Sequence, residues 1–190
     1  MPHIHTAPGL HDLTVSLFIM RTGGPEPLVL LHRHRSLGVW MQTGGHVELD
    51  ETPWQAVAHE LREETGYDLA QMSVLQPELR LPAQPTNDVH PVPVCLRTVP
   101  VPKGTAHQHW HIDLGFALVT EELPRQVIDA GESAELAWLT RGQIVDLPAD
   151  QTYEDVRRIH LWVIDSLLTA WRPVAATDFS TSGPPGAAGM

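Results

Sequence analysis

The sequence has 190 residues, a single cysteine and a formal net charge of −11, with 23 acidic against 12 basic residues. This charge argues against binding to a long nucleic-acid backbone, which requires a basic surface, and the single cysteine excludes an internal disulfide framework. The chain contains neither an apolar run long enough for a membrane-spanning helix nor the N-terminal pattern of a signal peptide. We therefore expect no membrane partner and a cytoplasmic location.

The first part of the chain predicts a hairpin followed by a helix. Residues 14–21 (TVSLFIMR) are apolar and β-branched and stop before a Gly-Gly-Pro turn, which predicts a strand with residues 27–32 (PLVLLH) as its partner. Thr52 and Pro53 suit the N-cap and the first position of a helix. That helix should end at Gly66, because glycine suits the left-handed conformation that follows a helix.

The second part predicts short strands and a last helix, after a proline-rich stretch over residues 77–102. We expect an extended piece at 92–98, strands at 109–119 and 135–139, and a helix at 153–171 that buries Val156, Ile159, Trp162, Val163 and Leu167. Strands alternating with two helices indicate the α/β class, with one domain over residues 1–172. Residues 173–190 are rich in Gly, Ser, Thr, Ala and Pro, which predicts a disordered tail.

Three carboxylates share one face of the first predicted helix. Glu60, Glu63 and Glu64 stand at positions i, i+3 and i+4. Close carboxylates repel each other, and a hard cation such as Mg²⁺ relieves that repulsion while keeping positions open for substrate phosphates. The alternative is a solvated acidic face, as in most acidic runs. The Gly-Gly loop before the helix and Glu51 at its start favour the metal site.

This segment resembles the signature of the Nudix hydrolases, G-x5-E-x7-R-E-U-x-E-E-x-G-U, where U is a bulky aliphatic residue. The residues that match it at the required spacing are Gly45, Glu51, Glu60, Leu61, Glu63, Glu64 and Gly66. Tyr67 is a mild departure at the last position. The larger departure is His59, which stands where the family has an arginine that anchors a motif glutamate by a bidentate ion pair. A histidine cannot form this bidentate pair and is not always charged, so the resemblance predicts a weakened or pH-sensitive site.

The resemblance implies a Nudix-type α/β/α sandwich, with a mixed sheet and a loop-helix-loop catalytic motif. It also implies hydrolysis of a diphosphate linkage in a nucleoside diphosphate derivative or a similar small molecule, with Mg²⁺ or Mn²⁺ as cofactor. Glu60 and Glu64 are then the first metal ligands, followed by Glu63 and the carbonyl of Gly45. The general base would be a motif glutamate, Glu63 or Glu64, or Glu132 in a later loop.

A second group of polar residues lies on the strand predicted at 109–119. On a strand, alternate residues share a face, so His107, His109, His111 and Asp113 point one way. Such a face can bind a transition metal or phosphate oxygens, and the alternative is an ordinary solvent-facing strand. Together with Asp88 and His90 upstream, the segment resembles a Nudix subgroup with D-x-H-P and H-x-H-x-D-x-x-F segments and poorly defined substrates.

The subgroup pattern implies that this strand lies beside the catalytic helix. His90, His109, His111 and Asp113 are therefore candidates for contacts to the substrate or to a second metal. Trp40, just before the glycine loop, is a candidate for stacking on a base, and packing under the loop is its alternative role.

Three other functions compete with the hydrolase. His59-Glu60-x-x-Glu63 is one histidine short of the zinc-peptidase motif H-E-x-x-H. A ligand sensor on a Nudix scaffold is possible because fold does not determine function. An isoprenyl diphosphate isomerase would need a cysteine-glutamate pair, and Cys95 has no such context. The sequence does not choose among diphosphate substrates, and a homodimer is the default expectation for the oligomeric state.

Overall fold

The computed structural model describes residues 7, 9–101, 109–128 and 135–182, and within them one eight-stranded sheet organises the chain. Its central path runs β3-β2-β1-β6-β4-β8, while β5 pairs with β6 and β7 pairs with β2. The strands are β1 His11–Arg21, β2 Leu28–Arg33, β3 Trp40–Met41, β4 Ser73–Gln76, β5 Cys95–Pro100, β6 Trp110–Thr120, β7 Leu136–Thr140 and β8 Arg172–Ala175. The strands expected from the sequence are confirmed, with ends that shift by one to three residues.

Parallel pairing of β1 with β6 forms the centre of the sheet. The two strands align in register over eleven positions, from His11 opposite Trp110 to Arg21 opposite Thr120. The other strand pairs are antiparallel, which makes the sheet mixed. Because a parallel pair needs a long crossover connection, the segment between β1 and β6 can carry a whole helix.

The main helix, α1, covers Pro53–Thr65 and has the ends that the sequence predicts. Thr52 and Gln55 form a capping box, and Gly66 has a left-handed φ of 73°. The remaining helical segments are α2 Arg141–Asp146, α3 Glu154–Trp162, the π-helical turn Val163–Leu167 and α4 Leu168–Ala170, with 3-10 turns at Leu69–Gln71 and Ala176–Asp178.

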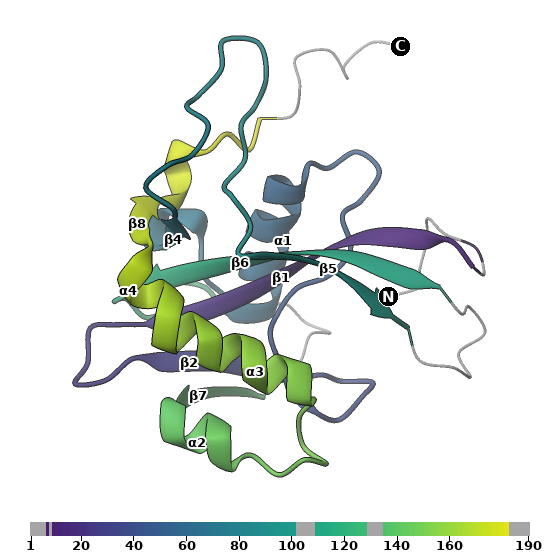
Figure 1. The fold of residues 1–190 in the computed structure, drawn as a ribbon, viewed down its shortest axis with the longest axis vertical. Helices are drawn as coiled ribbons and strands as arrows, with labels where there is room; N and C mark the ends of the chain where they lie inside the picture. Colours follow the sequence, from purple (N-terminus) through teal and green to yellow (C-terminus); the bar gives the residue numbers. More distant parts are fainter. Residues whose placement is uncertain (1–6, 8, 102–108, 129–134, 183–190) are drawn as a thin grey trace.

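Alternate residues of β1 divide the core into two layers. Val15, Leu17 and Ile19 pack with α1 residues, whereas Phe18 and Met20 pack with Val163, Leu167 and other residues of the C-terminal helical stretch. The two helical layers lie on opposite sides of the strands (Figure 1). This arrangement confirms the expected α/β/α sandwich with a mixed sheet.

Two expectations for the C-terminal part are wrong. Trp162 is 42% exposed, because the buried stripe of α3 runs through Val156, His160 and Val163, and Trp162 lies to one side of it. Residues 173–178 are ordered in β8 and the turn that follows, where a disordered tail was expected. Composition does not predict this strand, because β8 forms by pairing with β4, whose edge would otherwise have unpaired backbone groups.

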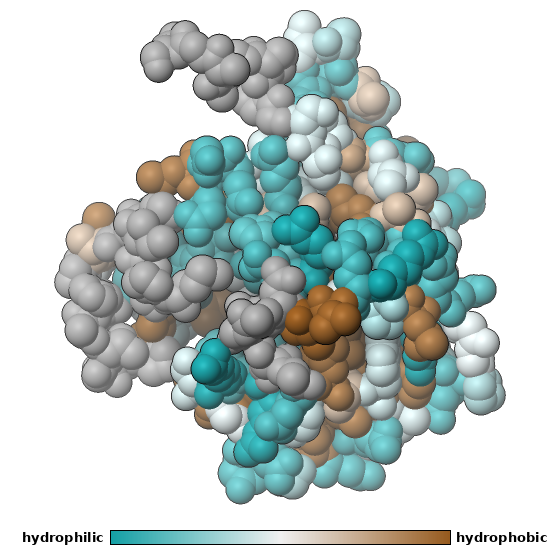
Figure 2. Space-filling model, turned by 180° about the vertical axis from the view of Figure 1, so that it is seen from behind, coloured by the Kyte–Doolittle hydropathy of each residue, from teal (hydrophilic) through white to brown (hydrophobic). Residues whose placement is uncertain are grey.

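The surface is mainly polar, and exposed apolar side chains occur in separate patches. On the face seen in Figure 2, hydrophilic residues surround several smaller hydrophobic areas. Single exposed apolar residues such as Leu49 and Leu79 are ordinary features of a protein surface. In the described part of the chain, no helix has both the length and the apolar character needed to cross a membrane.

His160 is a buried histidine in the layer between α3 and the sheet. Its Nδ1 donates a hydrogen bond to the Val156 carbonyl at 2.8 Å, and its ring makes an edge contact with Phe18. Burial lowers its pKa from 6.5 to about 4, despite the opposing effect of the Val156 bond; nearby Arg97 lowers it further. His160 is therefore neutral at pH 7.

We predict that His160→Leu makes protein stability less sensitive to acid. The folded-state pKa lies below the unfolded value, so the unfolded chain binds more protons and stability falls as pH falls from 7 towards 4. For His160 this loss is about 2 kcal/mol between pH 7 and pH 5. Urea unfolding of both proteins at the two pH values measures it. Equal losses in the two proteins would contradict the prediction.

Candidate functional site

The glycine loop, residues 43–47, attaches the main helix to the edge of β1. Val15 N–H donates to the Gly45 carbonyl and Leu17 N–H to the Thr43 carbonyl, both at 2.9 Å. Val47 N–H donates in return to the Leu13 carbonyl at 3.0 Å. The loop therefore follows β1 like a short irregular strand and holds a defined position beside α1.

Both glycines of the loop are required by close packing. Gly44 has φ of 139°, and a Cβ at this position would lie 2.1 Å from the Val15 carbonyl oxygen. A Cβ on Gly45 would lie 2.0 Å from Oε1 of Glu60. The carboxylate of Glu60 thus occupies the space that any larger residue at position 45 would need.

Glu60 and Glu64 converge on this loop from α1. Their residues are only 5% and 7% exposed. The backbone N–H of Gly44 donates to Oε2 of Glu64 at 2.8 Å, and Nδ1 of His32 lies 3.4 Å from Oε1 of the same carboxylate. Burial of acidic groups is costly unless they are paired, hydrogen-bonded or bound to a cation, so this pair is unlike a solvated acidic face.

His32 is a member of this site that the sequence motif does not identify. Burial, with a smaller contribution from nearby His34, lowers the pKa of His32 from 6.5 to about 4. It is therefore a neutral neighbour of Glu64 at pH 7. Alternation along β2 was the available signal, because His32 shares a face with Leu30, which packs on the α1 side.

Glu63 lies beside the buried pair and contacts the residue that replaces the motif arginine. Nε2 of His59 lies 2.7 Å from Oε1 of Glu63, and Nδ1 of His59 lies 3.2 Å from Oε1 of Glu51. Burial acts to lower the pKa of His59, but the hydrogen bond with Glu63 and the charges of Glu63, Glu51 and Glu60 raise it overall. The histidine contacts two motif carboxylates, one through each nitrogen.

His109 and His111 lie close to two residues that belong to neither sequence motif. His46, in the glycine loop, completes a group of three histidines whose ligand atoms lie within 4.8 Å of one another. Asp12 Oδ2 lies 3.6 Å from Nε2 of His46 and 3.8 Å from Nε2 of His109. The strand β6 lies beside the main helix as expected, because Phe116 on its other face contacts Trp54 of α1. By the alternation of β6, however, the histidines lie on the sheet face opposite α1, together with Ala117 and Val119.

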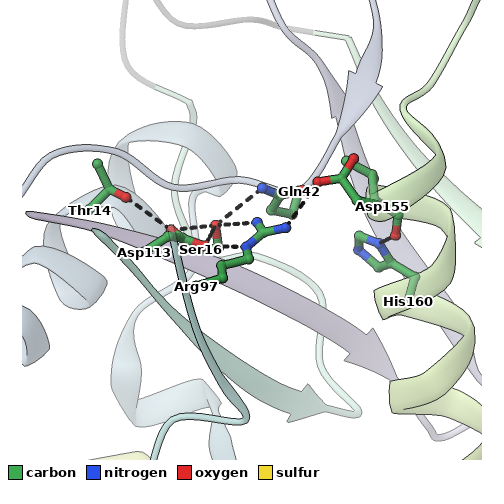
Figure 3. A network of polar contacts seen from close by, with 8 residues as sticks. Thr14, Ser16, Gln42, Arg97, Asp113, Asp155 and His160 are labelled. Carbon is green, nitrogen blue, oxygen red and sulfur yellow. Dashed lines mark hydrogen bonds and ion pairs between the residues drawn. The ribbon is translucent and has the colours of Figure 1, made fainter. Parts of the chain in front are cut away.

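Asp113 belongs to a separate network on the same face of the sheet. It accepts hydrogen bonds from Thr14 at 3.0 Å and Ser16 at 2.9 Å, and Nε of Arg97 lies 2.8 Å from its Oδ2. Arg97 reaches on to Asp155 of α3 at 3.2 Å (Figure 3). Arg97 has no motif around it, and only the pairing of β5 with β6 places it opposite Asp113.

The other candidate residues lie apart from these groups. Trp40 packs against the core layer that includes Val163. His90 lies between β4 and β5, outside the group of three histidines found among the described residues. Glu132 and His107 lie outside the described residues.

Several solved structures share this fold. A NUDIX-family hydrolase from Clostridium perfringens has a TM-score of 0.60 and 22% sequence identity, covering 81% of this chain and 96% of that one. A Caenorhabditis elegans Ap4A hydrolase has a TM-score of 0.56 and 19% identity, with coverage of 83% and 98%. The NUDIX domain of Shewanella oneidensis NrtR, complexed with ADP ribose, has a TM-score of 0.54 and 18% identity, with coverage of 84% and 88%.

Curated relatives and a family model match the sequence itself. A MutT-like protein from Streptomyces ambofaciens is 42% identical over 65 residues, which are 34% of this chain and 40% of that protein. An octanoyltransferase from Myxococcus xanthus is 47% identical over 55 residues, 28% of this chain and 15% of that protein. The matches thus span less than half the length of either relative. The model of the NUDIX domain matches residues 10–162, so the chain belongs to the NUDIX family.

Proposed function

We propose that this chain is a divalent-metal-dependent hydrolase that cleaves a diphosphate linkage in a nucleoside diphosphate derivative or a similar small molecule. The observation that carries the proposal is the convergence of buried Glu60 and Glu64 on the glycine loop. Family membership supports it, as do structural neighbours whose names refer to Ap4A, ADP ribose and dihydroneopterin triphosphate, all compounds with linked phosphates.

The residues present fit Mg²⁺ or Mn²⁺. Their donors are carboxylate oxygens, which hard cations prefer, and the absence of a side chain at Gly45 leaves room for the Glu60 carboxylate beside the Gly45 backbone. Glu60, Glu64, Glu63 and the Gly45 carbonyl would hold the ion. That carbonyl already accepts the Val15 N–H and keeps one lone pair for a ligand. When bound, the ion lowers the pKa of a water nucleophile and neutralises charge at the attacked phosphorus.

The residues around the carboxylates hold them in place. His59 orients Glu63 and Glu51, and the Gly44 N–H orients Glu64. Glu63 or Glu64 would accept the proton of the attacking water, with Glu132 as a further candidate for the general base. His90, His109, His111, Asp113 and Trp40 stay predictions for substrate contacts.

The rival functions receive less support from this geometry. In the zinc-peptidase alternative His59 would be a metal ligand, yet both of its ring nitrogens face carboxylates. The missing motif arginine favours the sensor alternative, but His59 contacts two motif carboxylates at that position. Metal binding without turnover is the result that would favour the sensor.

We predict that the wild-type protein cleaves at least one compound from a panel of nucleoside triphosphates, dinucleoside polyphosphates, nucleotide sugars and non-nucleotide diphosphates, and only with Mg²⁺ or Mn²⁺.

We predict that Glu64→Gln lowers kcat by about a hundredfold or more, because the substitution removes a charged catalytic group and keeps the shape of the side chain. Release of phosphate-containing products measures turnover. Glu26→Gln, at an exposed position, is the matched control. Near-wild-type kcat in Glu64→Gln would remove the assignment of Glu64.

We predict that Gly45→Ala lowers both metal affinity and turnover, since the added Cβ would displace the Glu60 carboxylate. We expect a loss of about tenfold or more in Mn²⁺ affinity, as for other groups that position ligands, measured by isothermal titration. Gly142→Ala is the control, because a Cβ there meets only Thr140 Oγ1 at 3.8 Å. Equal Mn²⁺ affinity in Gly45→Ala and wild type would argue against a metal site beside this glycine.

We predict that His59→Ala lowers kcat/KM by about tenfold to a hundredfold, the usual cost of losing a group that orients metal ligands. His59→Arg should retain more activity than His59→Ala, because a guanidinium can contact the carboxylates of both Glu51 and Glu63. Arg62→Ala, on an exposed face of the same helix, is the control. If His59→Arg were as impaired as His59→Ala, the contacts of His59 would not explain its role.

A further inference from the structure

The histidine cluster, defined as His46, His109 and His111 with Asp12, lies outside the glutamate site. Its imidazole ligand atoms lie within 4.8 Å of one another, and Nε2 of His109 lies 3.1 Å from Nε2 of His111. His109 and Asp12 are 2% and 4% exposed, whereas His46 and His111 are partly exposed.

Three separate segments are brought together here by backbone pairing. Asp12 of β1 stands opposite His111 of β6 in the parallel register, and Thr14 forms an isolated bridge with His46. His109 continues the line of β6 by pairing its carbonyl with the Val101 N–H at 3.0 Å. Backbone pairing with the centre of the sheet therefore sets the positions of all four residues, including His46 of the glycine loop.

Asp12 has a carboxylate oxygen that requires a partner. Oδ2 is buried and has no hydrogen bond among the described residues, although two histidines approach it at 3.6 and 3.8 Å. A buried carboxylate oxygen without a hydrogen bond is costly. A cation between Asp12 and the imidazoles would compensate this cost.

The spacing of the atoms matches a tetrahedral ion. Bonds of about 2.0 Å from zinc to nitrogen or oxygen place neighbouring ligand atoms about 3.3 Å apart. Of the six separations between the four ligand atoms, three are 3.1, 3.6 and 3.8 Å, close to this value. The three imidazole atoms all lie within 4.8 Å of one another.

The type of donor selects the metal. Imidazole nitrogens suit Zn²⁺ and other transition metals, whereas carboxylate oxygens such as those on α1 suit Mg²⁺ and Mn²⁺. We propose that Asp12, His46, His109 and His111 form a transition-metal site of the zinc class, distinct from the glutamate site. This site ties the glycine loop to β1 and β6, and it does not depend on the proposed hydrolase function.

The test uses the full chain, purified without a polyhistidine tag and stripped with a chelator. We expect Co²⁺ to bind with one equivalent giving the intense visible absorption of tetrahedral cobalt, and Zn²⁺ to displace it. The absorption should persist in the double variant Glu60→Gln, Glu64→Gln. His109→Ala should abolish it, and Asp12→Asn should weaken Co²⁺ affinity by about tenfold or more.

His11→Ala is the matched control, because His11 is an exposed histidine next to Asp12 on the same strand. X-ray absorption of the Zn²⁺-loaded wild-type protein gives a readout that needs no variant, and we expect scattering from about three imidazoles. Cobalt absorption lost with the glutamates, unchanged in His109→Ala, or absent from wild type would overturn the proposal. An oxygen-only zinc environment would overturn it as well.

Discussion

The parallel pairing of β1 with β6 extends over eleven consecutive residue pairs. The histidine cluster and the Asp113 network both depend on this alignment. It places Asp12 opposite His111 and Thr14 opposite Asp113. On the side of β1 away from β6, backbone hydrogen bonds hold the glycine loop, which precedes α1 in the chain. A one-residue slip between the strands would turn every alternating side chain to the wrong face, which would separate both the histidine cluster and the Asp113 network.

The glycine loop connects two chemically different groups on opposite faces of the sheet. At residue 45 the lack of a side chain leaves room for the Glu60 carboxylate, which comes from α1. At the next residue, His46 reaches the group formed by β1 and the β6 segment. The glutamates of α1 and the three imidazoles thus lie on opposite sides of the strands. Under the two proposals above, each side would bind its own class of cation, because metal preference follows donor type.

Carboxylates of this acidic chain are stabilised by different contacts at different positions. Glu64 accepts a backbone N–H, Glu63 contacts a histidine whose pKa is raised, and Asp113 pairs with Arg97. His32 and His160 are buried with lowered pKa values and add no positive charge at neutral pH. Positive charge is therefore placed beside Glu63 and Asp113.

The sequence by itself determined α1 with both of its ends and the spacing of Glu60, Glu63 and Glu64, because caps and helical periodicity are local properties. It also determined that His109, His111 and Asp113 share a face, since alternation needs only one strand. Tertiary structure decided which residues complete each group: Asp12 and His46 for the histidines, Arg97 for Asp113, and His32 for Glu64. It also decided that β8 is ordered and that His160 rather than Trp162 is buried. These outcomes depend on strand register and on which backbone edges remain open, and contacts between distant segments leave no periodic pattern in the sequence.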